Sequence, residues 1–355
     1  MTRSSRRLLA VASLLGLMAT AACGSDTTAA PAPAGSPTAG GAVPAEALVV
    51  YSGRNENLIG PLLELFTEET GIEATPRYGD SAELAAQLLE EGDRTPASVF
   101  LSQDAGALGA LEDAGRLETL DDADLDLVAP EFRSSEGQWV GVSGRARVLV
   151  YNPELVAEAD LPDSVFDLTE PAYRGKVAFA PTNASFQAFV TGMRVTAGEE
   201  RTREFLTAFQ ANEPQAYEKN GLIVDAVAAG EIPFGLTNHY YLYEKAAEAG
   251  GVEAFTARNH FFGGGDPGAL INVAGVGVLD GKGDERSQAF VDFLLGETAQ
   301  SYFAQETYEY PLTSGVETAA EGAPALDAIE GPDVDLSDLD SLAETLALLD
   351  EVGLT

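Results

Sequence analysis

Cysteine and histidine are nearly absent from this chain of 355 residues. Cys23 is the one cysteine, so no disulfide can form within the chain. The two histidines are His239 and His260, and the sequence contains neither a Gly-x-Ser-x-Gly motif nor a phosphate-binding Gly-Lys-Thr motif. No set of residues is typical of a nucleophile and its base, so we expect no enzyme. An internal repeat, which would indicate a structural or adhesive protein, is also missing.

Basic residues are scarce as well. The chain has 20 Lys and Arg against 57 Asp and Glu, which gives a formal net charge of −37. So acidic a protein repels phosphate backbones and anionic headgroups, so we expect no nucleic-acid partner, and the charge argues against adsorption to anionic lipid. Acidic residues are scattered along the whole chain, which favours solubility or salt adaptation. Attraction of cations is the second interpretation.

The first 22 residues have the pattern of an export signal. Three arginines precede an apolar run over residues 8–19, which is too short for a transmembrane helix. Small residues and then Cys23 follow, as at a lipoprotein signal-peptidase site. We expect residues 1–22 to be a lipoprotein signal peptide and Cys23 to carry the lipid. Plain secretion with an unused thiol is the alternative.

A segment rich in Ala, Pro, Gly, Ser and Thr follows Cys23. Its few apolar side chains cannot offset the entropy lost on ordering, so we expect residues 23–46 to be a flexible tether. The remaining chain, roughly 300 residues, is long enough for two lobes with separate cores. It shows no run long enough to cross a membrane.

From residue 48 onward, strand and helix patterns alternate, which predicts an α/β fold with mainly parallel sheets flanked by helices. The expected strands are residues 48–51, 72–78, 97–101, 145–151, 176–180, 234–236 and 271–279. The expected helices are residues 57–71, 81–91, 104–114, 185–196, 200–209, 221–229, 287–295 and 299–305. Ligands of such sheets lie beyond the carboxyl ends of strands, so we expect a site at residues 52–56, 79–80 and 102–104. The acidic tail from Val334 is amphipathic.

Five short motifs, in order, resemble those of the bacterial ferric-ion-binding proteins of iron importers. They are VYSGR (50–54), TPASVF (95–100), SGRARV (143–148), NHYY (238–241) and DPGA (266–269). The likeness covers nearly all of residues 48–312. It implies a two-lobed, type II periplasmic-binding-protein-like fold with a hinged cleft. One lobe would comprise residues 47–145 and 271–321, and the other residues 146–270 and 322–355.

The resemblance implies that Tyr240 and Tyr241 supply two phenolate ligands. Ferric iron is small, highly charged and hard, and it stabilises the deprotonated form of a phenol. Consecutive side chains converge on one ion only at a turn or a helix entry, which fits the position after the strand at 234–236. Packing of the two rings between the lobes is the alternative. We expect Tyr243 to be packing and His239 to point away.

At two other positions the chain departs from the family. The best-known members have a His in the first loop and a Glu after the third strand, where this chain has Asn55 and Gln103. Both are neutral and weak donors for ferric iron. Either the two tyrosines and an external anion hold the metal, or another group such as Tyr78 or Asp104 moves in. The further Tyr of other branches is also missing, because Phe186 and its neighbours stand there.

The resemblance also implies a site for a synergistic anion, phosphate or carbonate. Free N–H groups and the positive end of a helix dipole suit an anion where a helix begins near residue 183. The matching residues are Asn183, Ala184, Ser185, Asn220 and Asn238. Simple helix capping by Thr182 or Asn183 is the alternative, and both can hold at once.

Two arginines of the motifs, Arg54 and Arg145, either assist the anion or form structural salt bridges.

The expected function is that of an extracytoplasmic solute-binding lipoprotein. It would capture ferric iron with its anion and deliver it to the permease of an ABC importer. We expect a monomer, attached to the outer face of the cell membrane by its lipid alone. The alternative is the same fold binding a phosphonate, sulfate, polyamine or small organic anion. The sequence leaves open the full ligand set, the identity of the anion, the affinity, whether iron arrives free or chelated, and whether the resting state is open.

Overall fold

The computed structural model describes residues 47–355, which belong to one compact unit, Val43–Thr355. The expected signal peptide, the expected lipidation at Cys23 and the tether at 23–46 lie outside the described residues. Among residues 47–355, no helix is long and apolar enough to cross a membrane.

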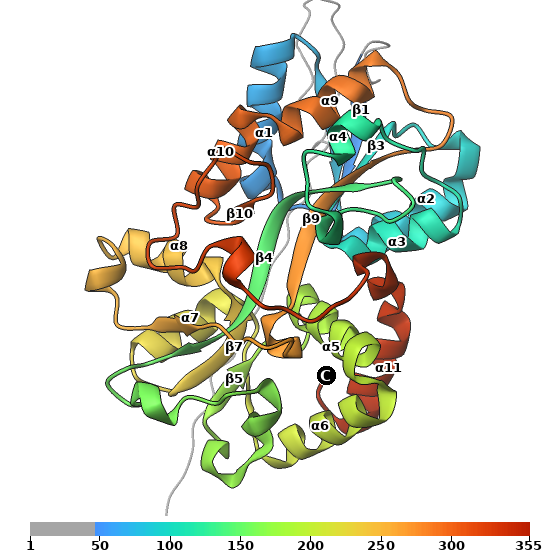
Figure 1. Cartoon of the computed structure of the whole chain (residues 1–355). Helices are drawn as coiled ribbons and strands as arrows, with labels where there is room; N and C mark the ends of the chain where they lie inside the picture. The colour runs from blue at the N-terminus through green and yellow to red at the C-terminus, as the bar shows by residue number, and fades with distance from the viewer. Residues whose placement is uncertain (1–46) are drawn as a thin grey trace, which may run out of the picture. The chain divides into compact units, whose positions relative to one another are not determined.

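Within residues 47–355, ten strands form one hydrogen-bonded system with the order β2-β1-β3-β9-β4-β7-β5-β6, with β10 and β8 paired to β4 (Figure 1). The strands are β1 (Leu48–Ser52), β2 (Ala74–Tyr78), β3 (Val99–Ser102), β4 (Val140–Tyr151), β5 (Val177–Phe179), β6 (Gln215–Ala216), β7 (Phe234–Asn238), β8 (Arg258–His260), β9 (Ile271–Val278) and β10 (Tyr310–Pro311). The alternation of short buried runs in the sequence therefore marks most of the strands correctly.

The strand β4 belongs to two sheets. Its first part, up to Ala146, pairs with β9, and Gly144 pairs with β10. Its second part, from Arg147, pairs with β7 and β8. The first sheet is therefore β2-β1-β3-β9-β4 and the second β4-β7-β5-β6. This is the two-lobed arrangement of type II binding proteins, as expected.

Both sheets are mixed, whereas the strand–helix repeats predict mainly parallel ones. The pairs β1–β2, β1–β3, β5–β7 and β5–β6 are parallel. The strands β4 and β9 run antiparallel to their neighbours, because the chain passes through them from one sheet to the other. The sequence predicts both crossing strands, at residues 145–151 and 271–279, but its repeat pattern does not reveal that they run antiparallel to their neighbours.

Helices cover both sheets. They are α1 (Glu56–Thr70), α2 (Ser81–Glu91), α3 (Ala105–Asp113), α4 (Asp122–Leu125), α5 (Ala184–Ala197), α6 (Glu199–Ala211), α7 (Asn220–Ala228), α8 (Tyr240–Glu248), α9 (Glu285–Leu295), α10 (Glu297–Glu306) and α11 (Leu342–Val352). In the first helix, Asn55 is the N-cap, not Asn57, because the Asn55 side chain accepts a hydrogen bond from the backbone N–H of Asn57. Gly71 ends that helix in the left-handed region, as expected.

The strand β4 begins five residues before the expected start at Arg145. Glycine and serine weaken the strand pattern over residues 140–144, yet this stretch is buried. The small residue at Gly141 is required, because a Cβ there would lie 2.5 Å from the carbonyl oxygen of Phe132. Close packing therefore requires a small residue at Gly141, and small residues weaken the strand pattern in the sequence.

The C-terminal tail contacts both halves of the fold. Residues 336–340 lie against α3, and Trp139 donates a hydrogen bond of 3.1 Å to the hydroxyl of Ser337. The helix α11 then packs on α5, where the hydroxyls of Thr345 and Thr191 are 2.8 Å apart. The apolar spacing of the tail is thus used for packing, and Leu349 is fully buried.

Candidate functional site

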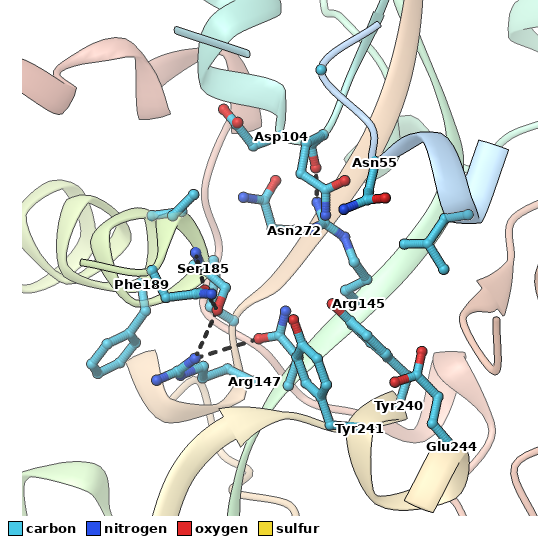
Figure 2. A pocket seen from close by; sticks show the side chains of 18 of the residues that line it. Asn55, Asp104, Arg145, Arg147, Ser185, Phe189, Tyr240, Tyr241, Glu244 and Asn272 are labelled. Atoms are coloured by element: carbon cyan, nitrogen blue, oxygen red, sulfur yellow. Dashed lines mark hydrogen bonds between the residues drawn. The ribbon is translucent and has the colours of Figure 1, made fainter. Parts of the chain in front are cut away.

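A cavity of about 420 Å³ lies where the two sheets meet on β4 (Figure 2). Helix starts and strand ends of both sheets surround it, as expected for an α/β fold. Its lining comprises Gly53, Asn55, Asn57, Leu58, Gln103, Asp104, Arg145, Arg147, Asn183, Ala184, Ser185, Ala188, Phe189, Asn238, Tyr240, Tyr241, Glu244, Leu270 and Asn272. The four residues expected at the metal therefore lie in one cavity.

Tyr240 and Tyr241 open the helix α8 directly after β7. Their rings stack with centroids 4.3 Å apart and an interplanar angle of 30°. The helix entry lets two consecutive side chains line one cavity, as the chemistry of a shared ion requires. Burial, and next the neighbouring Tyr241, raise the pKa of Tyr240 well above its ordinary value. Tyr240 is therefore a neutral phenol at pH 7.

His239 and Tyr243 serve packing. The Nδ1 of His239 accepts from the backbone N–H of Ala146 at 3.2 Å, and its Nε2 lies 3.0 Å from the carbonyl oxygen of Tyr308. Its ring stacks on Tyr310 at 4.5 Å. Burial lowers the pKa of His239 to about 4, so the imidazole is neutral at pH 7. Neither residue lines the cavity, which agrees with the roles expected for both.

The start of α5 is a network of polar side chains. The Oδ1 of Asn183 accepts from the backbone N–H of Ser185 at 3.0 Å, from its hydroxyl at 2.6 Å and from the Nδ2 of Asn220 at 3.2 Å. Asn183 is thus the N-cap. Asn183, Ala184, Ser185 and Asn238 line the cavity, whereas Asn220 is buried behind them and braces the hydroxyl of Ser185 at 2.9 Å.

Arg147 is a buried cation of this cavity that the sequence reasoning missed. Its guanidinium donates to the carbonyl of Leu236 at 3.0 Å, to Asn238 at 3.5 Å and to the hydroxyl of Ser185 at 3.4 Å. Its Nε has no partner, and within residues 47–355 no carboxylate pairs with it. Burial lowers the pKa of Arg147 to about 9. Residues two apart on a strand share a face, so the spacing of Arg147 from Arg145 could have predicted that both side chains line the same cavity.

Arg54 and Arg145 are held by Glu309, a buried carboxylate that the sequence reasoning also missed. The pair Arg54–Glu309 is bidentate, at 2.9 and 2.8 Å, and the Nε of Arg145 lies 3.6 Å from the same carboxylate. Burial alone would raise the pKa of Glu309, but the guanidiniums, Arg54 first, lower it. Arg54 does not line the cavity, so the salt-bridge alternative holds for it. Arg145 both pairs with Glu309 and lines the cavity.

Asn55, Gln103 and Asp104 form what we call the loop wall of the cavity. The Oδ1 of Asn55 caps α1, and Asp104 caps α3 by accepting from the backbone N–H of Ala107 at 3.1 Å. The backbone carbonyl of Gln103 accepts from Arg145. Tyr78, the other replacement considered, does not line the cavity.

Tyr240, Tyr241 and Glu244 form the opposite face, which we call the α8 wall (Figure 2). Burial, and next the charge of Glu309, raise the pKa of Glu244 to about 7. Within residues 47–355, no three or more His, Cys, Asp and Glu side chains are grouped as they would be to hold a metal. The acidic oxygen donors that line the cavity are the phenols of Tyr240 and Tyr241 and the carboxylates of Asp104 and Glu244.

A cavity between two α/β lobes, lined by paired tyrosines and guanidiniums, is suited to the capture of a small solute. Residues 94–331 match the family described as bacterial extracellular solute-binding protein, and the chain belongs to that family. The resemblance read from the five motifs is confirmed.

Curated relatives carry iron in their names. The Fe(3+)-binding periplasmic protein of Serratia marcescens is 34% identical over 311 residues, which cover 87% of this chain and 91% of the relative. The major ferric iron-binding protein of Neisseria gonorrhoeae is 30% identical over 309 residues, covering 86% and 93%.

Solved structures agree. Iron-bound HitA from Pseudomonas aeruginosa has a TM-score of 0.79 at 34% identity, over 87% of this chain and 99% of that one. A Trichodesmium protein in complex with iron and citrate has a TM-score of 0.74 at 26% identity, over 87% and 100%.

Proposed function

We propose that this protein captures ferric iron together with a synergistic anion. Tyr240 and Tyr241, side by side at the entry of α8 and lining one cavity, are the observation that carries the proposal. Two phenolates are hard, anionic donors, and a trivalent cation favours their formation despite the high pKa of Tyr240. The iron named in the relatives supports the same cargo.

The anion lies between the iron and the start of α5. Arg147 supplies a buried positive charge without a carboxylate partner among the described residues, beside Ser185 and Asn238. The dipole of α5 adds to it at the same end of the helix. The charge of Arg147 and the dipole of α5 would stabilise a divalent phosphate or carbonate at this position. Within residues 47–355, no carboxylate forms an ion pair with Arg147. A neighbour that binds iron with citrate supports an anion in such a cleft.

Residues 47–145 with 271–321, and 146–270 with 322–355, are the two lobes, and they close over the iron about β4. Closure brings the loop wall, with Asn55 and Gln103, towards the α8 wall, so cargo binding favours the closed form. The protein acts as a monomer outside the cytoplasm, and lipid on Cys23 anchors it to the outer face of the membrane. It delivers iron to the permease of an ABC importer.

Titration with ferric citrate tests the proposal. We expect a phenolate-to-iron charge-transfer band in the visible range, one iron per chain by metal analysis, and a higher melting temperature. A colourless protein that ferric citrate does not stabilise, but that free citrate, sulfate or a phosphonate does, would contradict iron capture and favour a small organic or inorganic anion as cargo.

A further inference from the structure

Glu244 lies on the same face of α8 as the two tyrosines. It follows Tyr241 by three residues and Tyr240 by four, which are the spacings of side-chain neighbours on a helix. Side chains of a helix lean towards its N-terminus, so the carboxylate leans towards the first turn, where the phenols lie. All three side chains line the cavity, and Figure 2 shows the carboxylate beside the two rings.

The carboxylate of Glu244 has no hydrogen bond or ion pair within residues 47–355. The adjacent Lys245 pairs instead with Asp225 at 3.0 Å and approaches Glu248 at 3.9 Å. Glu244 is nevertheless partly buried, and this burial raises its pKa to about 7. A half-buried charge without a partner costs free energy, and a bound cation would remove that cost.

The loop wall offers one carboxylate, that of Asp104, and it already accepts a hydrogen bond at the start of α3. Asn55 and Gln103 are neutral, and the Oδ1 of Asn55 is already used as a cap. Asp104 is also a cap, through the backbone N–H of Ala107. A trivalent cation bound by two phenolates keeps one positive charge, and Glu244 is the carboxylate of the cavity lining that forms no such cap.

We propose that Glu244 is the third anionic ligand of the ferric ion. The proposal rests on the proposed function and names a ligand that the motifs do not indicate. The phenolates of Tyr240 and Tyr241 and the carboxylate of Glu244 together balance the three charges of the ion. All three donors then come from less than two turns of one helix, so iron binds to the α8 wall before the loop wall approaches. The anion lies on the remaining side, next to Arg147.

The variant Glu244→Gln keeps the size of the side chain and removes the charge. Glu248→Gln is the matched control, because Glu248 is exposed and lies one turn further along the same helix. Competition against citrate should show a loss of ferric affinity for Glu244→Gln at least as large as the roughly 10- to 100-fold that removal of an outer-shell partner costs. Its visible band should move to longer wavelength, since iron with fewer anionic ligands accepts charge more readily. The control should keep both values.

The outcomes separate the two proposals. If the wild type shows no band with ferric citrate, the proposed function fails. If the wild type shows the band and Glu244→Gln has the same affinity and band, only the ligand role fails. A loss of affinity that disappears in about 1 M sodium chloride, with the band unmoved, also overturns it, because a screened remote charge explains that result. Glu244→Asp guards against misfolding: it should keep the band near the wild-type position with an intermediate affinity.

Discussion

The two walls of the cavity differ in where their charge comes from. The α8 wall carries two phenols and a carboxylate with no cap to form, whereas on the loop wall Asn55 and Asp104 are occupied as helix caps and Gln103 is neutral. A helix start can place several donors close together, while one loop contributes Asn55 and another contributes Gln103 and Asp104. If the proposed ligands are correct, anionic ligation is concentrated on one side of the cleft, and substitutions on the other side should have smaller effects.

The largest effect should come from the α8 wall. Tyr240→Phe and Tyr241→Phe each delete an anionic donor and keep the ring, so the fold should persist. Each should weaken ferric binding by more than roughly 100-fold, which is the upper end of the loss seen when a residue that only supports a ligand is removed. Each should also weaken or abolish the visible band. Tyr243→Phe is the control, because that buried ring lies outside the cavity lining. Unchanged binding in both test variants would contradict iron capture at this wall.

Removing the anion should have the next largest effect. Asn183→Asp places a carboxylate at the start of α5 and repels phosphate or carbonate, so ferric affinity should fall by roughly 10-fold, on the order of 1.4 kcal/mol. Affinity and band should also differ between phosphate, bicarbonate and anion-free buffers. Asn57→Asp is the control, because it adds the same charge elsewhere in the cavity lining. Its ferric affinity should fall less than that of Asn183→Asp. Identical titrations in all three buffers would show that no anion binds.

The pH dependence sharpens the comparison further. Burial, and then Glu309 and Glu248, raise the pKa of Glu244 to about 7, while Lys245 and Arg54 lower it. Iron displaces protons from its ligands, so affinity rises with pH. Below pH 7 Glu244 is protonated in the empty protein, and one more proton must leave on binding. From pH 7 to pH 6 the wild type should therefore lose up to about 10-fold more affinity than Glu244→Gln. Parallel pH profiles, measured by citrate competition, would contradict this.

The smallest effect should come from restoring donors to the loop wall. Asn55→His with Gln103→Glu places harder ligands there, and ferric affinity should rise several-fold in the wild type. In the Glu244→Gln background the gain should be larger, because a charge is then missing. Equilibrium titration of the four proteins measures both gains. No gain in either background would mean that the loop wall does not reach the metal.

Local patterns predicted the parts of this protein that depend on neighbouring residues. The apolar spacing of α1 and its end at Gly71 are local features, and so is the Tyr240–Tyr241 pair. The missing parts depend on distant partners. Glu309 lies 255 residues from Arg54, so nothing near either residue indicates their ion pair.

The early start of β4 was hidden for a similar reason. Gly141 and Gly144 are small because β10 and the segment before β4 pack against them, which sequence spacing does not reveal. The proposed role of Glu244 could not be predicted from the sequence, because it depends on how α8 is buried and oriented in the fold. Arg147, in contrast, shares its strand face with Arg145 and was within reach of the sequence.

The double pairing of β4 also limits how the chain can be divided. A cut between Ala146 and Arg147 would give each fragment a piece of β4 that ends at the cleft, with no continuous strand to hold the two sheets in register. Strand edges without partners invite aggregation. The halves are therefore poor candidates for separate expression or exchange between relatives, whereas the cavity lining can be re-engineered residue by residue on an intact framework.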